Sequence, residues 1–274
     1  MLAMDDNAIL LAQGNVRIKR TRHGLMAYNI NDEYLGRSLD VYGEYSLGET
    51  ELFAKLVRPG SIVLDIGANI GAHTLFFARA VGRGGGVVAI EPQRALYQLL
   101  CANLALNECI NVRTIQAAAG AAPGRTFLTA VDYAKPGNFG GVALTEQAGE
   151  PTEIITVDSL RLNSCHFVKI DVEGYEAPVI AGARETIERF RPVLYVENDR
   201  RSKSADLIHQ IRSLGYELYW HCPPLYSANN FYGNATNLWP GIVSIDMLAL
   251  PKNRAGDISG LRPVTGPDDW PLAK

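Results

Sequence analysis

The run from Ser61 to Glu91 limits the fold more than any other part of this sequence. An apolar stretch, SIVLDIG, leads through a glycine-containing loop into AHTLFFARAV, residues 72–81, which the glycines of 82–86 terminate. The first stretch is typical of a buried strand and the second of a helix. GVVAIEP then predicts the next strand. Strand, glycine loop, helix and strand in this order indicate a parallel α/β unit with a ligand-binding edge.

The same alternation continues along the chain. Apolar residues at helical spacing predict a helix over 93–107, and a strand follows over 110–119. Further helices are predicted over 177–190 and 204–214, and the remaining strands are predicted at 166–172, 192–197, 216–221 and 242–250. This order predicts an α/β fold with a mostly parallel, Rossmann-like sheet of seven strands and helices on both faces.

The length of 274 residues favours one large domain with extensions over two equal domains. We expect residues 1–50 to form an N-terminal extension or cap and residues 51–250 to form the domain. Two strand-like runs separated by a Gly/Pro/Asn-rich stretch predict an inserted hairpin and loop at about 124–160. Residues 251–274, poor in aliphatic side chains, are expected to form a frayed tail.

Charge and composition exclude several classes of protein. The net charge of -3 provides no overall field for a polyanion, so nucleic acid is not expected as an obligatory partner. No apolar run reaches the ~18 residues that span a bilayer, and acidic residues stand near the N-terminus where a signal peptide needs positive charge. The four cysteines contain no C-x-x-C pair. We therefore expect a cytoplasmic protein without a membrane span, and the oligomeric state stays open.

Two acidic residues make the glycine loop more informative. Asp65 ends the first strand of the unit and Glu91 ends the second, where a carboxylate can accept hydrogen bonds from ribose hydroxyls. A nicotinamide dinucleotide site would need G-x-G-x-x-G, and its pyrophosphate would lie close to Asp65. A ligand with an ammonium group and a sulfonium tolerates that carboxylate. The pattern favours S-adenosylmethionine over a dinucleotide, the alternative being that Gly67 and Gly71 only shape a tight turn.

Two further positions fit the same ligand. Asn107 closes the second predicted helix, and small residues that include Ala117 and Ala118 end the third strand, where they would admit a flat adenine. The alternative for the alanines is close packing between helix and sheet.

Four titratable side chains end later strands and can converge on one rim of the sheet. Asp171 and Glu173 follow the fourth strand, Glu197 ends the fifth and His221 ends the sixth. Asp171 is the first candidate for a contact with donor or acceptor, while strand-end polar groups can also simply cap helices. Lys169 is expected to point to the other face or to form a salt bridge. A divalent cation bound by Asp171, Glu197 and Asp199 is a further option.

Several segments together resemble the FkbM-type methyltransferase family. They are GEYSLGETELF (43–53), VLDIGANIGAHT (63–74), AIEPQ (89–93), FVKIDVEGYE (167–176), PVLYVEN (192–198) and a late run from residue 223 to residue 251. The resemblance implies a class I methyltransferase fold with one antiparallel strand, here 242–250. It also implies S-adenosyl-L-methionine as donor, with S-adenosyl-L-homocysteine as product, and a hydroxyl oxygen of a sugar or secondary metabolite as acceptor.

The expected sites follow from the motifs and the resemblance together. The residues expected to bind the donor are Asp65, Gly67, Ala68, Asn69, Gly71, Thr74, Glu91, Pro92, Asn107, Ala117, Ala118 and Asp171. The expected catalytic residues are Asp171, Glu173, Glu197 and His221. Aromatic and amide side chains in the loop 223–241 suit a small-molecule or glycan acceptor, or else a packed loop. Glu44, Tyr45 and Glu49 are candidates for a lid over the donor. An NAD-dependent oxidoreductase and a donor-binding module without turnover remain the alternatives.

Overall fold

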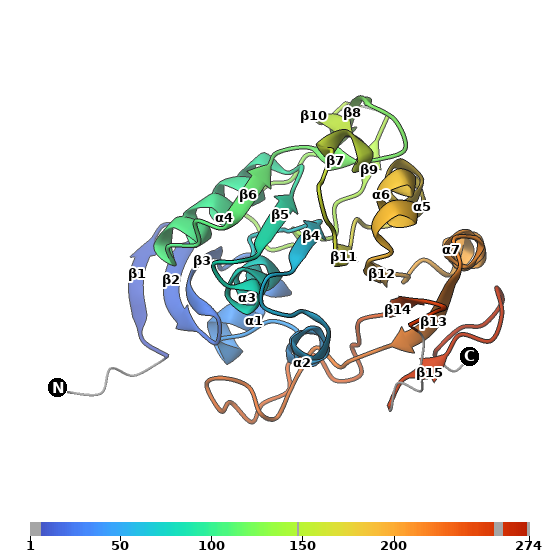
Figure 1. Cartoon of the computed structure of the whole chain (residues 1–274). Coiled ribbons are helices and arrows are strands. Elements are labelled where there is room, and N and C mark those ends of the chain that lie inside the picture. Colours follow the sequence, from blue (N-terminus) through green and yellow to red (C-terminus); the bar gives the residue numbers. More distant parts are fainter. Residues whose placement is uncertain (1–6, 147, 255–259, 273–274) are drawn as a thin grey trace.

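A central sheet of eight strands organises the computed structural model, which describes residues 7–146, 148–254 and 260–272 (Figure 1). The strand order is β15-β13-β14-β12-β11-β4-β5-β6. The bounds are β4 Ile62–Ile66, β5 Gly86–Ile90, β6 Val112–Ile115, β11 Phe167–Ile170, β12 Val193–Glu197, β13 Tyr216–His221, β14 Asp246–Pro251 and β15 Arg262–Pro263. All seven predicted strands of the sheet are therefore present.

The direction of the strands agrees with the prediction, and the strand count exceeds it by one. The five strands from β12 to β6 are parallel, and β14 is antiparallel to both β12 and β13. The additional strand, β15, comes from the tail and pairs antiparallel with β13. Val264, directly after β15, is buried and its N–H bonds to Leu218 O. Val264 thus helps to anchor this part of the tail beside β13, which extends the sheet by one strand.

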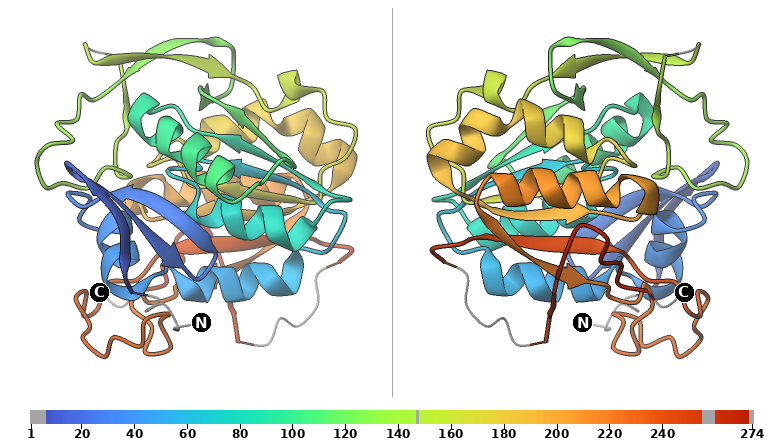
Figure 2. Two further views of the ribbon diagram at one scale, coloured as in Figure 1. Left: turned by 90° about the vertical axis from the view of Figure 1, so that its left-hand side faces the viewer. Right: turned by 90° about the vertical axis from the view of Figure 1, so that its right-hand side faces the viewer.

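Helices cover both faces of the sheet, and the side chains of each strand alternate between them. In β5, Val88 and Ile90 pack with one cluster, whereas Val87 and Ala89 face the other side. The first face is covered by α5 (Glu176–Gly182), α6 (Arg184–Phe190) and α7 (Arg201–Ser213), and the second by α2 (Leu47–Leu56), α3 (Ala72–Val81) and α4 (Arg94–Leu106). Figure 2 shows the two faces in turn, with α3 and α4 in front in the left view and α5, α6 and α7 in front in the right view.

Two predicted elements are divided in the structure. The helix expected over 177–190 is split at Ala183 into α5 and α6. The strand expected over 110–119 ends at Ile115, and residues 118–119 form β7 in a second sheet of order β7-β10-β8-β9. This sheet contains the predicted insertion, in which β8 (Gly124–Leu128) and β10 (Glu150–Ile155) are antiparallel and β9 is Leu144–Thr145. A short 3-10 helix, η1 (Asp158–Leu160), leads back to the main sheet.

The N-terminal region forms a small antiparallel sheet of β1 (Ile9–Gln13), β2 (Val16–Thr21) and β3 (Gly24–Asn29), followed by α1 (Leu35–Tyr42). The side chain of Asn103 joins β3 to α4, because it accepts from Ala27 N and donates to Ala27 O. The late loop between β13 and β14 lies beside this region in both figures. Across the described ranges, none of the helices has both the length and the apolar character needed to cross a bilayer.

Candidate functional site

The glycine loop between β4 and α3 lies at the carboxyl edge of the sheet. Gly67 has a φ of 79°, and a Cβ atom there would lie 1.7 Å from Asp171 O, so a larger residue cannot occupy this position. The N–H groups of Gly67 and Ala68 both donate to Ile90 O, at the end of β5. The loop is therefore held between the ends of β5 and β11 and brings Asp65, Glu91 and Asp171 together.

Asp65 is fully buried at the end of β4. Its Oδ2 accepts a hydrogen bond of 2.6 Å from Thr74 Oγ1, and its Oδ1 has no hydrogen-bond partner among the described residues. Lys169 Nζ lies 3.9 Å from Oδ1 and 2.8 Å from Asp171 Oδ2. Burial raises the pKa of Asp65, and the Lys169 charge opposes that rise. The salt bridge expected for Lys169 is confirmed, and this lysine lies inside the site.

Glu91 is buried at the end of β5 and faces the same loop. Its Oε2 accepts from Asn69 N at 2.8 Å, and its Oε1 accepts from Gln93 N at 2.9 Å. Burial raises its pKa to about 7, although both hydrogen bonds favour the ionised form. Because each carboxylate oxygen has two acceptor sites, one on each oxygen is left for a ligand hydroxyl.

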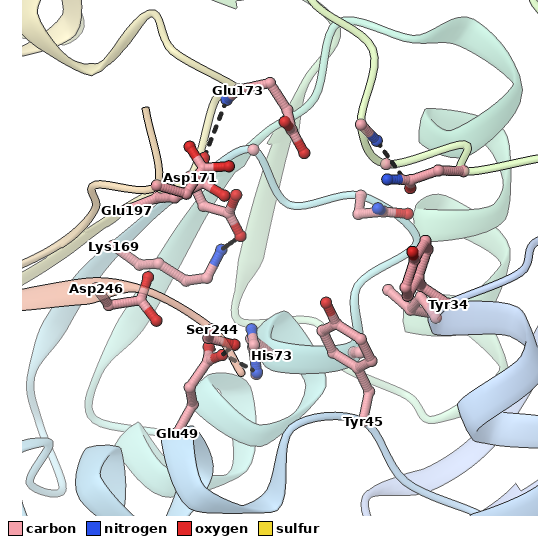
Figure 3. A pocket seen from close by; sticks show the side chains of 18 of the residues that line it. Tyr34, Tyr45, Glu49, His73, Lys169, Asp171, Glu173, Glu197, Ser244 and Asp246 are labelled. Carbon is pink, nitrogen blue, oxygen red and sulfur yellow. Dashed lines mark hydrogen bonds and ion pairs between the residues drawn. The ribbon is translucent and has the colours of Figure 1, made fainter. Parts of the chain in front are cut away.

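Two adjoining cavities open at this edge of the sheet. The larger, of about 430 Å³, is polar and is shown in Figure 3. The smaller, of about 50 Å³, is a more apolar slot between the main sheet and the insertion, lined by Ala117, Ala118, Leu128, Val142 and Val172 among others. Gly67, Glu91, Asp171 and Glu173 line both. A flat apolar group and a polar group can thus be bound side by side.

Acidic side chains form one wall of the polar cavity. Asp171, Glu173 and Glu197 each offer an oxygen within 4.8 Å of the others. Glu173 pairs with Arg200, and Glu197 Oε2 accepts from Glu173 N at 3.3 Å. Burial raises the pKa of Glu173 to about 7 and raises that of Glu197 as well. Asp199 lines the cavity too and pairs with Arg200.

Most of the residues expected at the site meet there. Asp65, Gly67, Ala68, Asn69, Glu91, Asp171, Glu173 and Glu197 line the polar cavity, and Pro92, Ala117 and Ala118 line the slot. Four expected residues lie outside both cavities. Thr74 supports Asp65 from behind, and a Cβ on Gly71 would meet Leu100 in the helix layer. Asn107 points to β3, where it bonds Leu25 N and O.

His221, the fourth, bonds Tyr195 OH through Nδ1 at 2.9 Å instead of facing the cavity. Desolvation lowers its pKa to about 4. Because β13 lies beyond β14 in the strand order, its end is two strands away from β12. The strand order was not predicted from the sequence, and it explains why His221 does not join the acidic side chains.

Several cavity residues were not predicted. His73, in the first turn of α3, and Asp246, at the start of β14, both line the polar cavity with Ser244 (Figure 3). Glu49 and Tyr45, expected only as a lid, contribute to its wall. A helix residue directly after a glycine loop was the available signal for His73. Asp246 stands at the start of its strand, and the antiparallel direction of β14 brings that start to the carboxyl edge of the parallel strands.

The loop 223–241 is a packed segment. Tyr226 and Trp239 pack against Tyr42 at ring-centroid distances of 5.4 and 5.5 Å, and Phe231 N donates to Glu44. Its aromatic side chains thus contact the N-terminal region. Leu225 is the residue of this loop that lines the polar cavity.

The family model described as the methyltransferase FkbM domain matches residues 65–218, more than half of the chain. The chain belongs to the FkbM methyltransferase domain family. The matched segment runs from Asp65 into β13 and contains the whole acidic wall. The sheet with its antiparallel β14 is that of the class I methyltransferase fold, as the sequence resemblance implied.

Other similarities of this FkbM-domain chain are more distant. The large-subunit ribosomal RNA methyltransferase E of two Acidithiobacillus ferrooxidans strains is 31% identical over 122 residues, or 44% of this chain and 52% of each relative. The chain thus spans about half the length of these relatives. A crystal structure of methyltransferase FkbM from Methylobacillus flagellatus KT is 19% identical, with a TM-score of 0.47, over 79% of this chain and 55% of that one. Aeropyrum pernix fibrillarin with natively bound S-adenosyl-L-methionine is 14% identical, with a TM-score of 0.46, over 86% and 94% of the two chains.

Proposed function

We propose that this protein transfers a methyl group from S-adenosylmethionine to a hydroxyl oxygen of a sugar or secondary-metabolite acceptor. One observation carries the proposal. Asp65 and Glu91 flank a glycine loop at which a polar cavity meets a narrow apolar slot. Membership of a methyltransferase family favours this function over an NAD-dependent oxidoreductase.

The residues of the edge fit the donor's chemistry. Asp65 Oδ1, buried and without a hydrogen-bond partner among the residues described, would receive the ammonium group of the donor. Glu91, with acceptor capacity left on both oxygens, would hold the ribose hydroxyls. The adenine ring would lie against the alanines of the slot and bury apolar surface between the sheet and the insertion.

The acidic wall supports a small polyol acceptor over nucleic acid. The polar cavity is lined by Asp171, Glu173, Glu197 and Asp199. Two cationic side chains, Lys169 and Arg200, also line it, and both form ion pairs with residues of this wall. Carboxylates that line a site repel phosphate groups. The ribosomal RNA substrate in the name of the distant relatives is therefore not carried over to this chain.

The chain's contribution to the reaction is chiefly alignment. The donor supplies an already activated methyl group, and holding acceptor and donor in line can contribute about 7–11 kcal/mol. Asp171, which lines both cavities, would orient donor and acceptor, and its carboxylate pairs with Lys169. Asp171, Glu173 and Glu197 could also hold a divalent cation through oxygen ligands, but the proposed transfer does not depend on one.

Titration calorimetry tests the donor assignment. S-adenosylhomocysteine should bind with a Kd below about 1 mM, equivalent to about 4 kcal/mol, and NADH should not bind. Incubation of the protein with methyl-labelled donor and a small-molecule extract of the native cell should then label an acceptor, with a mass increase of one methyl group. NADH binding without S-adenosylhomocysteine binding would support the oxidoreductase. Donor binding without any labelled acceptor would support a binding module.

A further inference from the structure

His73 is the one imidazole among the residues that line the polar cavity in the described chain. It is 6% exposed, and the rings of Tyr45 and Phe53 pack against it at centroid distances of 5.8 and 5.4 Å. Its Nε2 is buried, lies 3.5 Å from Glu49 Oε2 and makes no hydrogen bond within the described ranges. The second ring nitrogen, Nδ1, points away from Glu49 (Figure 3). Nε2 thus faces the Glu49 carboxylate, and Nδ1 is directed to the other side of the ring.

Glu49 is positioned by contacts that leave one oxygen for the imidazole. Its Oε1 accepts from Ser46 Oγ at 2.6 Å and from Ser244 Oγ at 2.8 Å, while Oε2 faces His73. Glu49 is itself only 5% exposed. Two hydroxyls from different parts of the chain therefore fix this carboxylate beside the ring, and the arrangement favours the tautomer that carries its proton on Nε2.

Three carboxylates of the acidic wall already have polar partners. Asp171 is paired with Lys169 at 2.8 Å, Glu173 is paired with Arg200, and Glu197 accepts from a backbone N–H. Each of these three carboxylates is therefore already oriented by a partner within the acidic wall. Among the described residues that line the cavity, His73 offers a basic ring nitrogen that is not paired with a cationic side chain.

Building on the proposed methyl transfer, we infer that His73 Nδ1 is the general base that removes the acceptor's hydroxyl proton, with Glu49 as its positioning residue. The acceptor O–H bond breaks and its proton moves to Nδ1. The oxygen's electron pair forms the new bond to the methyl carbon, and the carbon–sulfur bond breaks with its electrons left on sulfur. The imidazolium that forms is stabilised by the Glu49 carboxylate and returns its proton to solvent.

The charged and titratable groups around His73 come from several elements. Glu49 lies on α2, Tyr45 precedes it, Lys169 lies on β11, and His23 lies in the turn between β2 and β3. Burial lowers the pKa of His73 well below its usual value, and Lys169 and His23 act in the same direction. The ring is therefore neutral at neutral pH, which is the form that accepts a proton.

Single-turnover transfer from methyl-labelled donor to the native-cell extract tests the inference. His73→Asn should reduce the rate by about 10²–10⁴ while the Kd for S-adenosylhomocysteine stays within threefold of wild type. His209→Asn, which changes an exposed histidine on α7, is the matched control and should transfer at the wild-type rate. Equal rates for His73→Asn and wild type would overturn the assignment.

The variant Glu49→Gln tests whether Glu49 positions His73 or only supports the fold. Loss of the carboxylate should lower the pKa of His73 further, so the acid limb of the pH–rate profile should move to lower pH while the plateau rate falls. A purely structural Glu49 would lower the rate without moving that limb, which would overturn its positioning role. Wild-type protein that binds S-adenosylhomocysteine but labels nothing would overturn the proposed function and this inference together. If wild type and His73→Asn both transfer the methyl group at the same rate, only the inference about His73 is overturned and the proposed function stands.

Discussion

Thr74 donates a hydrogen bond of 2.6 Å to Asp65 Oδ2, and the other oxygen of the same buried carboxylate is left without a hydrogen bond from any described residue. Both residues are fully buried, so water cannot replace this contact. Thr74 therefore fixes the orientation of the Asp65 carboxylate, whose Oδ1 lies 3.9 Å from Lys169 Nζ. A residue outside the cavity wall can in this way govern ligand binding.

Replacement of Thr74 by valine should weaken donor binding. The change keeps the shape and removes the hydroxyl, and a hydrogen bond to a charged group contributes about 1.5–3 kcal/mol. We expect the Kd for S-adenosylhomocysteine to rise about 10-fold to 100-fold by titration calorimetry. Thr74→Ser, which keeps the hydroxyl, should stay within threefold of wild type. An unchanged Kd in Thr74→Val would show that Asp65 does not need this support.

Donor affinity should depend on pH through Glu91. Burial raises the pKa of Glu91 to about 7, and its ionised form is the better acceptor for ribose hydroxyls. The carboxylate gains its charge as the pH rises through 7, so the Kd for S-adenosylhomocysteine should fall about tenfold between pH 6 and pH 8.

The variant Glu91→Ala tests that assignment. It should bind more weakly at both pH values and lose the dependence. Glu173 has a pKa of about 7 as well, so Glu173→Gln is the control and should keep the dependence. A wild-type affinity that is flat from pH 6 to pH 8 would contradict the role given to Glu91.

Lys169 should be important for stability as well as for the site. Its side chain is 3% exposed and lies between Asp65 and Asp171, so its removal leaves buried carboxylates without a cation. Lys169→Met should lower the free energy of unfolding by about 3–5 kcal/mol in urea denaturation. Lys252, whose exposed side chain lies 3.8 Å from Glu217, is the matched control, and Lys252→Met should cost less than about 1 kcal/mol. Equal losses for the two variants would contradict the buried pairing.

The strands and their ends could be predicted because their signal is local. Apolar runs followed by Asp65, Glu91 and Asp171 identify strand ends, and parallel topology then brings these ends to one edge. The β1 strand, by contrast, is exposed along its whole length, so it carries no periodic pattern. Its small sheet was therefore described from the sequence only as an extension or cap.

Contacts between distant segments could not be predicted in the same way. His73 meets Glu49 because α2 packs against α3, and Ser244 reaches Glu49 across 195 positions of sequence. Neither relation leaves a spacing pattern in the chain. His221 shows the opposite case, since its position at a strand end is clear from the sequence but the order of the strands is not. The strand-end residues of the site could thus be predicted better than the residues from distant segments that meet them there.

A prediction about Asn107 separates a role in donor binding, suggested by its sequence position, from a role in stability, suggested by its contacts. Its place after α4 suggested donor binding, but its Oδ1 accepts from Leu25 N at 2.9 Å and its Nδ2 donates to Leu25 O at 2.7 Å. These bonds tie the N-terminal sheet to the domain. Asn107→Ala leaves both backbone groups of Leu25 without this partner, so we expect a loss of about 1–3 kcal/mol in urea denaturation.

The Kd of Asn107→Ala for S-adenosylhomocysteine should remain within twofold of wild type, because the side chain lies outside both cavities. Glu91→Ala should give a clear increase in that Kd, which makes it the reference for a true donor contact. Paired calorimetry and unfolding curves for the two variants decide between the two roles. A tenfold weaker affinity of Asn107→Ala with an unchanged unfolding curve would return Asn107 to the donor site, because a residue that only joins two parts of the fold must act through stability.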